Sequence, residues 1–123
     1  MSTELSILYV EDNAMLRATL LEYLEETGHQ VVAVATAEDA LVELDRQRFH
    51  ILLTDVSLPG KSGIELGRET YARFPETRII LATGFDLAND QSKINIPGAT
   101  LLPKPFDLDR VDDALAEIAA SLS

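Results

Sequence analysis

Three acidic residues, a threonine and a lysine are the side chains of this sequence whose types and spacing could do chemistry. Glu11 and Asp12 are adjacent, while Asp55, Thr83 and Lys104 are far apart, each at or just past the end of a short apolar run. If the fold gathers them, three carboxylates in a partly desolvated cleft repel one another, and a bound cation is the simplest way to neutralise them. Oxygen-only ligands favour Mg²⁺, and charges of −3 from these acids, +2 from the metal and +1 from the lysine sum to zero.

The chemistry that suits such a neutral site is phosphoryl transfer onto a carboxylate. Asp55 is the expected nucleophile because it stands alone at a strand end, whereas the adjacent Glu11 and Asp12 suit metal binding. The Thr83 hydroxyl and the Lys104 ammonium can each hold a phosphoryl oxygen. The sequence therefore predicts an aspartyl phosphate at Asp55.

Five short apolar runs alternate with segments of helical spacing, and this alternation predicts the elements that would position the site. The runs are continuous, which is typical of strands covered by helices on both faces of a parallel sheet. We therefore expect an α/β fold of the (βα)5 type, with one doubly wound five-stranded parallel sheet whose strand carboxyl ends share one edge. The predicted strands are 7–10, 31–35, 51–53, 79–82 and 99–102.

The segments between the runs carry helix signals. Thr36 and Asp107 are expected N-caps, Gly28 is placed to end the first helix, and Pro75 is placed to end the third. A fourth helix is expected over 86–96, where the apolar pattern is poor. The stripes predicted to face the core are Leu16, Leu20 and Leu24; Ala37, Ala40, Leu41 and Leu44; Ile64, Gly67, Tyr71 and Phe74; and Leu108, Val111, Leu115, Ile118 and Leu122.

Composition excludes several classes of function. The 123 residues include 10 Lys and Arg against 21 Asp and Glu, a net charge of −11, which argues against direct binding to nucleic acid or an anionic membrane. Cysteine is absent, so disulfides, thiolate metal sites and a cysteine nucleophile are excluded. Without a secretion signal or a run of about 18 apolar residues, the protein is expected to be cytoplasmic, with one domain over 1–123 and no effector domain.

At the site residues the sequence resembles the receiver domains of two-component response regulators. The resemblance spans residues from 7 to about 122. The amino-acid sequence at 10–13 and 81–85 is similar to that of receivers attached to hybrid histidine kinases. Its motifs are Glu11-Asp12, Asp55 followed by Leu58-Pro59-Gly60 and Gly63, Ala82-Thr83-Gly84, and Lys104-Pro105-Phe106.

The resemblance implies a role for each site residue. Asp55 would be the phosphoacceptor, Thr83 the switch hydroxyl and Lys104 the phosphate-binding ammonium. The Mg²⁺ ligands would be Asp12, Asp55 and the backbone carbonyl of Ser57, with Glu11 acting largely through water.

The resemblance also implies a fold and partners. The fold would be flavodoxin-like with strand order 2-1-3-4-5, and the phosphoryl donor would be a histidine kinase or a histidine phosphotransfer protein. Phosphorylation would change the surface around the fourth helix and the fifth strand. Leu101 departs from the family pattern, because receivers usually carry a switch aromatic there. Phe85 is bulky for a position bordering the phosphoryl group and is expected to prolong the phosphorylated state.

Two alternatives stay open at this point. One is a Mg²⁺-dependent phosphohydrolase with an aspartate nucleophile, although enzymes of the haloacid dehalogenase kind need Asp-x-Asp where Glu11 and Asp12 are adjacent here. The other is a receiver-like interaction module that is not phosphorylated. Beyond catalysing its own phosphorylation and dephosphorylation, the chain is not expected to be an enzyme.

Overall fold

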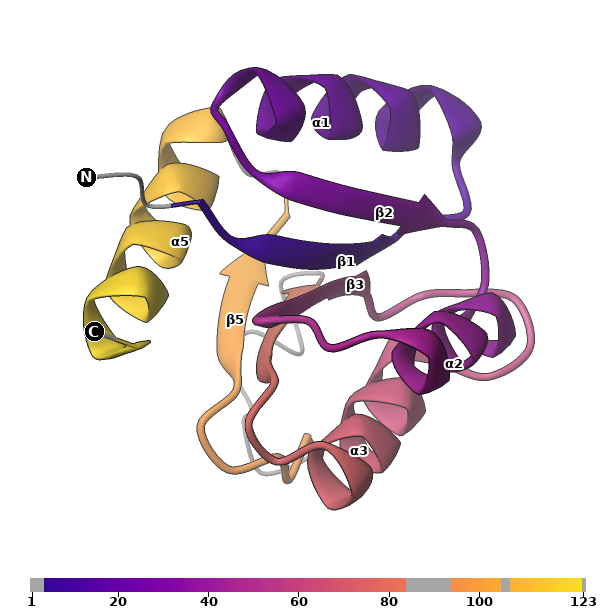
Figure 1. Ribbon diagram of the computed structural model, residues 1–123. Helices are drawn as coiled ribbons and strands as arrows, with labels where there is room; N and C mark the ends of the chain where they lie inside the picture. Colours follow the sequence, from indigo (N-terminus) through magenta and orange to yellow (C-terminus); the bar gives the residue numbers. More distant parts are fainter. Residues whose placement is uncertain (1–3, 84–93, 105–106, 123) are drawn as a thin grey trace.

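The computed structural model describes residues 4–83, 94–104 and 107–122, in which five parallel strands form one sheet of order β2-β1-β3-β4-β5 (Figure 1). The predicted fold class and strand order are confirmed. Phe85 and most of the predicted helix over 86–96 lie outside the described residues. The elements are β1 (Ser6–Val10), α1 (Ala14–Glu26), β2 (Gln30–Val34), α2 (Ala37–Arg46), β3 (Ile51–Asp55), α3 (Gly63–Arg73), β4 (Arg78–Thr83), β5 (Thr100–Pro103) and α5 (Leu108–Leu122).

The strand register brings the carboxyl ends of the strands level. Val10 of β1 lies beside Thr54 of β3, and Thr83 of β4 lies beside Pro103 of β5. Asp55 ends β3 one residue beyond Thr54. The residues that end or follow β1, β3, β4 and β5 therefore begin from one edge of the sheet, where ligands of such folds bind.

Successive strand residues point to opposite sides of the sheet, and helices bury both sides. Ile7 and Tyr9 of β1 belong to a core shared with α1 and α5, whereas Leu8 and Val10 belong to a second core shared with α2 and α3. Figure 1 shows these two helix layers around the sheet. This arrangement explains why the strand sequences are continuously apolar.

Local capping sets where the helices begin and end. Thr36 accepts the Asp39 N–H at 3.0 Å and Asp107 accepts the Arg110 N–H at 3.0 Å, so both predicted N-caps are confirmed. Gly28 follows the end of α1 with a φ of +98°, a left-handed conformation that glycine adopts without strain.

Several positions of the predicted apolar stripes are wrong. Leu16 is 53% exposed, and Tyr71 is also exposed. The inward face of α3 is instead formed by Leu66, Gly67 and Thr70, because Gly67 lets the helix approach Ile79 and Ile96 closely. The exposed Leu108 and Leu122 stand in the first and last turns of α5.

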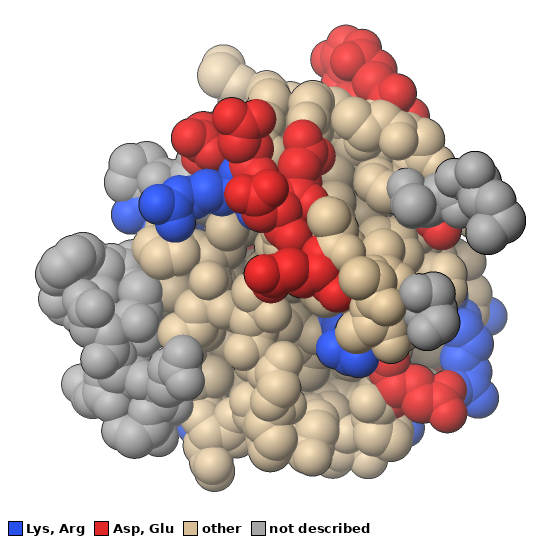
Figure 2. Space-filling view, turned by 90° about the vertical axis from the view of Figure 1, so that its left-hand side faces the viewer, with Lys and Arg blue, Asp and Glu red and all other residues tan. Residues whose placement is uncertain are grey.

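A band of acidic side chains lies on the face that carries α5 (Figure 2). Asp109, Asp113 and Glu117 recur every four residues along α5 and are exposed, opposite the buried stripe that includes Val111 and Leu115. Figure 2, which views this side of the molecule, shows a band of acidic side chains. Among the helices within the described residues, none combines the length and the apolar character needed to cross a membrane.

Candidate functional site

Asp55 lies at the centre of the candidate site, and only 7% of its surface is exposed. Its Oδ2 accepts a hydrogen bond from Lys104 Nζ at 2.7 Å, forming an ion pair. Its Oδ1 accepts the backbone N–H of Ser57 at 3.1 Å. Because each carboxylate oxygen has its own donor, the side chain is held in one orientation at the end of β3.

Glu11 and Asp12 bring two further carboxylates to the same place. One carboxylate oxygen from each of Glu11, Asp12 and Asp55 lies within 4.8 Å of the other two. Asp12 is exposed, whereas Glu11 is buried and its Oε2 accepts the Asn13 N–H at 3.1 Å. Burial, together with the negative charge of Asp55, raises the pKa of Glu11, although the Asn13 N–H and the Lys104 charge oppose that rise.

The donor set of this acidic cluster fits a small divalent cation. All three side chains offer hard oxygen ligands, and Lys104 Nζ lies 2.7 Å from Asp55. With three carboxylates against one ammonium, a charge of about −2 is left, which equals the charge that Mg²⁺ would neutralise.

Thr83 reaches the site through the backbone. It ends β4, is 1% exposed, and its carbonyl oxygen accepts the Lys104 N–H at 2.7 Å. The Val56 N–H donates to the Ala82 carbonyl at 3.0 Å, which joins the residue after Asp55 to the residue before Thr83. The site residues predicted from the sequence therefore lie at one edge of the sheet: the three carboxylates, Thr83 and Lys104. The Ser57 backbone contacts Asp55 at the same edge.

Arg17 is a residue of this region that the sequence alone did not single out. Its Nη1 donates to the backbone carbonyl of Glu11 at 2.8 Å, so a side chain of α1 holds the loop that carries the acid pair. Burial and the charges of Glu11 and Asp55 raise the pKa of Tyr9, and the Arg17 charge opposes this rise. The only sequence signal was a basic residue one turn into a helix, which is too common to identify a site.

Comparison with known proteins agrees with this geometry. The family described as "Response regulator receiver domain" matches residues 7–116. The response regulator protein FleR of Pseudomonas aeruginosa is 34% identical over 114 residues, which cover 92% of this chain but 24% of FleR. The response regulator receiver protein CpdR of Brucella abortus is 34% identical over 103 residues, covering 83% of this chain and 86% of CpdR.

A solved structure supports the fold independently. The chemotaxis response regulator CheY4 of Vibrio cholerae superposes with a TM-score of 0.84 at 22% identity, covering 94% of this chain and 98% of CheY4. The family match extends over most of the chain and includes the acidic cluster, Thr83 and Lys104. This chain therefore belongs to the family of response regulator receiver domains.

Proposed function

We propose that this chain is a phosphoacceptor switch of a two-component phosphorelay and that Asp55 accepts the phosphoryl group. The observation that carries the proposal is the Asp55 carboxylate itself. It is buried, and it accepts a hydrogen bond from Lys104 Nζ at 2.7 Å. One of its oxygens lies within 4.8 Å of one carboxylate oxygen of Glu11 and one of Asp12. This combination supplies a fixed oxygen nucleophile beside a cation and a metal-binding set.

In the proposed reaction an Asp55 oxygen attacks phosphorus and forms an O–P bond. The bond between phosphorus and the donor's imidazole nitrogen breaks, and its electron pair returns to that nitrogen. Lys104 and the Thr83 hydroxyl hold oxygens of the transferring group, because both lie at the edge where Asp55 ends its strand.

The proposed Mg²⁺ site consists of the Glu11, Asp12 and Asp55 carboxylates and the backbone carbonyl of Ser57. When bound there, the ion supplies positive charge that offsets both the acids and the phosphoryl oxygens. Glu11 contributes buried negative charge, with its own carboxylate steadied by the Asn13 N–H. Asp12, which is exposed, is accessible to a hydrated ion.

The proposed donor is a histidine kinase or a histidine phosphotransfer protein. The proposed output is a changed surface around the predicted helix over 86–96 and β5. Leu101 of β5 is half-buried and packs against the core cluster of Ile79 and Leu81, so the response has no aromatic ring to move at that position. We assign the signal instead to the segment after Thr83 and the predicted helix over 86–96, most of which lies outside the described residues. Receiver domains are signalling switches rather than classical enzymes, and the phosphohydrolase alternative is not favoured.

Incubation with acetyl phosphate and Mg²⁺, followed by intact-mass measurement, tests the proposal. We expect one phosphoryl group per chain, absent when EDTA is present throughout the incubation and absent in Asp55→Asn. Asp113→Asn, which alters an exposed acid of α5, is the matched control and should be labelled like the wild type. Equal labelling of Asp55→Asn, or multiple turnover of small phosphoesters, would contradict the proposed function.

A further inference from the structure

The loop between β3 and α3, residues 56–62, is tied to Asp55 at its start and closed on itself at its end. At its start the Ser57 N–H donates to Asp55 Oδ1 at 3.1 Å, and at its end the Gly63 N–H donates to the Val56 carbonyl at 2.9 Å. The middle of the loop, Gly60 and Lys61, has no strand beside it among the pairings of the described sheet. Side chains from two helices hold it instead.

Glu38, in the first turn of α2, holds the backbone of this loop. Its Oε2 accepts the Lys61 N–H at 3.4 Å. Gly60 has a left-handed φ of +74°, and a Cβ added to it would lie 3.4 Å from the same Glu38 oxygen. The left-handed backbone is what favours glycine here, since a Cβ would be in ordinary contact with the carboxylate.

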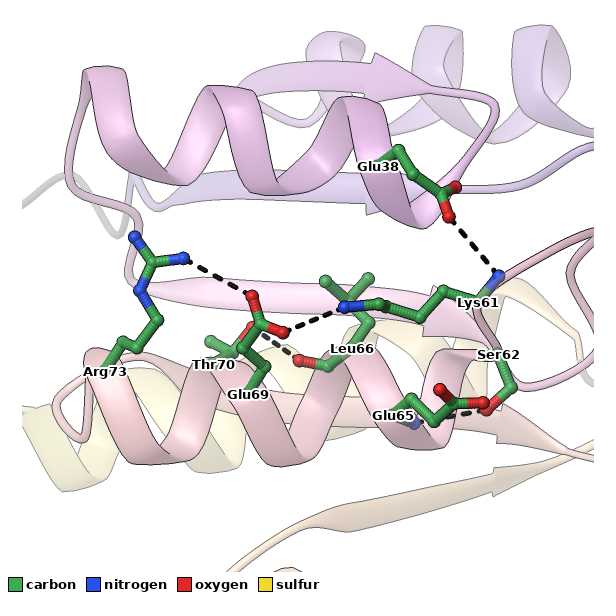
Figure 3. Close-up of polar contacts among 8 residues, drawn as sticks. All are labelled: Glu38, Lys61, Ser62, Glu65, Leu66, Glu69, Thr70 and Arg73. Atoms are coloured by element: carbon green, nitrogen blue, oxygen red, sulfur yellow. Dashed lines mark hydrogen bonds and ion pairs between the residues drawn. The ribbon is translucent and has the colours of Figure 1, made fainter.

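Lys61 also reaches α3 through its side chain, as Figure 3 shows. Its Nζ lies 2.9 Å from Glu69 Oε1, and the two side chains are 29% and 34% exposed. This hydrogen bond raises the pKa of Lys61 and lowers the pKa of Glu69. One residue of the loop is thus held at its N–H by α2 and at its ammonium by α3.

A second link joins the same helices away from the loop. Arg73, in the last turn of α3, has Nη1 3.4 Å from Glu69 Oε2, and its Nη2 is paired with Asp45 of α2. These ion pairs form a row that runs from Lys61 through Glu69 to Arg73 (Figure 3). Lys61, at one end, belongs to the loop, whereas Arg73, at the other end, only joins the two helices. This difference allows the two roles to be separated by substitution.

We propose that Lys61 is a positioning residue for the site, acting with Glu38 and Glu69 through the loop. By holding residues 60 and 61 between α2 and α3, it keeps the Ser57 backbone against Asp55 and so keeps the metal-binding set assembled. The inference rests on the proposed function, since it assigns a purpose to the loop of that site. Because the Lys61–Glu69 pair is partly exposed, salt weakens it.

The test compares Lys61→Met, Lys61→Arg and Arg73→Met by calorimetric Mg²⁺ titration and by the rate of labelling with acetyl phosphate. Lys61→Met should raise the Mg²⁺ dissociation constant about two- to fivefold, the range that one partly exposed ion pair supports. Lys61→Arg should restore most of the affinity. Arg73→Met should bind Mg²⁺ like the wild type, and raising the salt concentration should narrow the gap between Lys61→Met and wild type.

The outcomes separate the two proposals. Equal Mg²⁺ affinity of Lys61→Met and the wild type, or an equal loss in Arg73→Met, would overturn the positioning role. Failure of the wild type to form an aspartyl phosphate would overturn the proposed function, while the titrations still decide whether Lys61 supports metal binding. Glu69→Gln, which removes the same pair from the α3 side, should reproduce the loss seen in Lys61→Met.

Discussion

The position of Asp55 depends on Gly63, eight residues later, because this residue has no side chain. A Cβ added to Gly63 would lie 2.0 Å from the Asp55 carbonyl oxygen and 2.9 Å from Val56 Cα, so the backbone itself would have to move. The first turn of α3 packs against the end of β3 at this contact. Glycine is therefore required here for space rather than for an unusual backbone angle.

Gly63→Ala should lower the free energy of unfolding by about 1–3 kcal/mol, the usual cost of overpacking, and slow labelling of Asp55. Gly67→Ala is the matched control in the same helix. Its Cβ would meet the terminal methyl of Ile96 at 2.8 Å, a flexible neighbour, and the better helix propensity of alanine offsets about 0.5–1 kcal/mol. Urea unfolding measures both, and equal stability of Gly63→Ala and the wild type would contradict the steric explanation.

Among the elements, α1 presents an apolar surface directly after the acid pair. Met15 is 79% exposed and Leu16 is 53% exposed, and both stand in the first turn of α1, next to the loop that carries Glu11 and Asp12. Exposed apolar side chains beside a reactive site are suited to contact a protein partner. If the proposed phosphohistidine donor reaches Asp55, this turn is the surface that we expect it to contact.

Met15→Glu should slow phosphoryl transfer from a phosphohistidine protein about tenfold and leave labelling by acetyl phosphate unchanged, because only the protein donor covers the helix. Val42→Glu, at an exposed apolar position of α2, is the control and should slow neither reaction. Phosphoryl-transfer assays with both donors, quenched at a series of times, measure the two rates. A loss with acetyl phosphate as well would place the effect in the site rather than in donor binding.

The elements also show how far the sequence could predict this molecule. Five apolar runs predicted the strands, and the family resemblance predicted their order. Polar residues at the strand ends predicted the acidic cluster, because strand ends of a parallel sheet share an edge. Periodicity failed for Leu16 and Tyr71, since it detects apolar spacing but not which turns overhang the sheet. Contacts made by side chains between elements, such as Arg17 to Glu11 and Lys61 to Glu69, follow from tertiary geometry alone.

At the scale of the whole molecule, both histidines hold the start of β1, a strand with neighbours on both sides. The Leu5 N–H donates to His29 Nδ1 at 3.1 Å, and the Ser6 N–H donates to His50 Nδ1 at 2.9 Å. Each imidazole supplies an acceptor beside β1 where the strand ladder begins. Burial lowers the pKa of His29, although the carboxylates of Asp112 and Glu4 oppose that shift.

Since the folded state favours neutral His29, its stabilising contribution is fully present above about pH 6.5 and is lost as the pH falls through the lowered pKa of the folded protein. His29→Ala should cost about 1 kcal/mol at pH 7.5, where the acceptor is lost, and less at pH 5.5. Urea unfolding of both proteins at the two pH values measures this. A constant difference between them would show that His29 does not contribute to the pH dependence.

The place of β1 in the sheet has a consequence for how the chain is made. Of the five strands of this sheet, β1 is the first to leave the ribosome, yet it lies between β2 and β3, so its second neighbour is not available until Asp55 has been synthesised. Until then its apolar residues have an open edge, which is a template for unwanted pairing. A nascent chain arrested before that point should therefore be a client for chaperones, whereas one arrested beyond it can close the centre of its sheet.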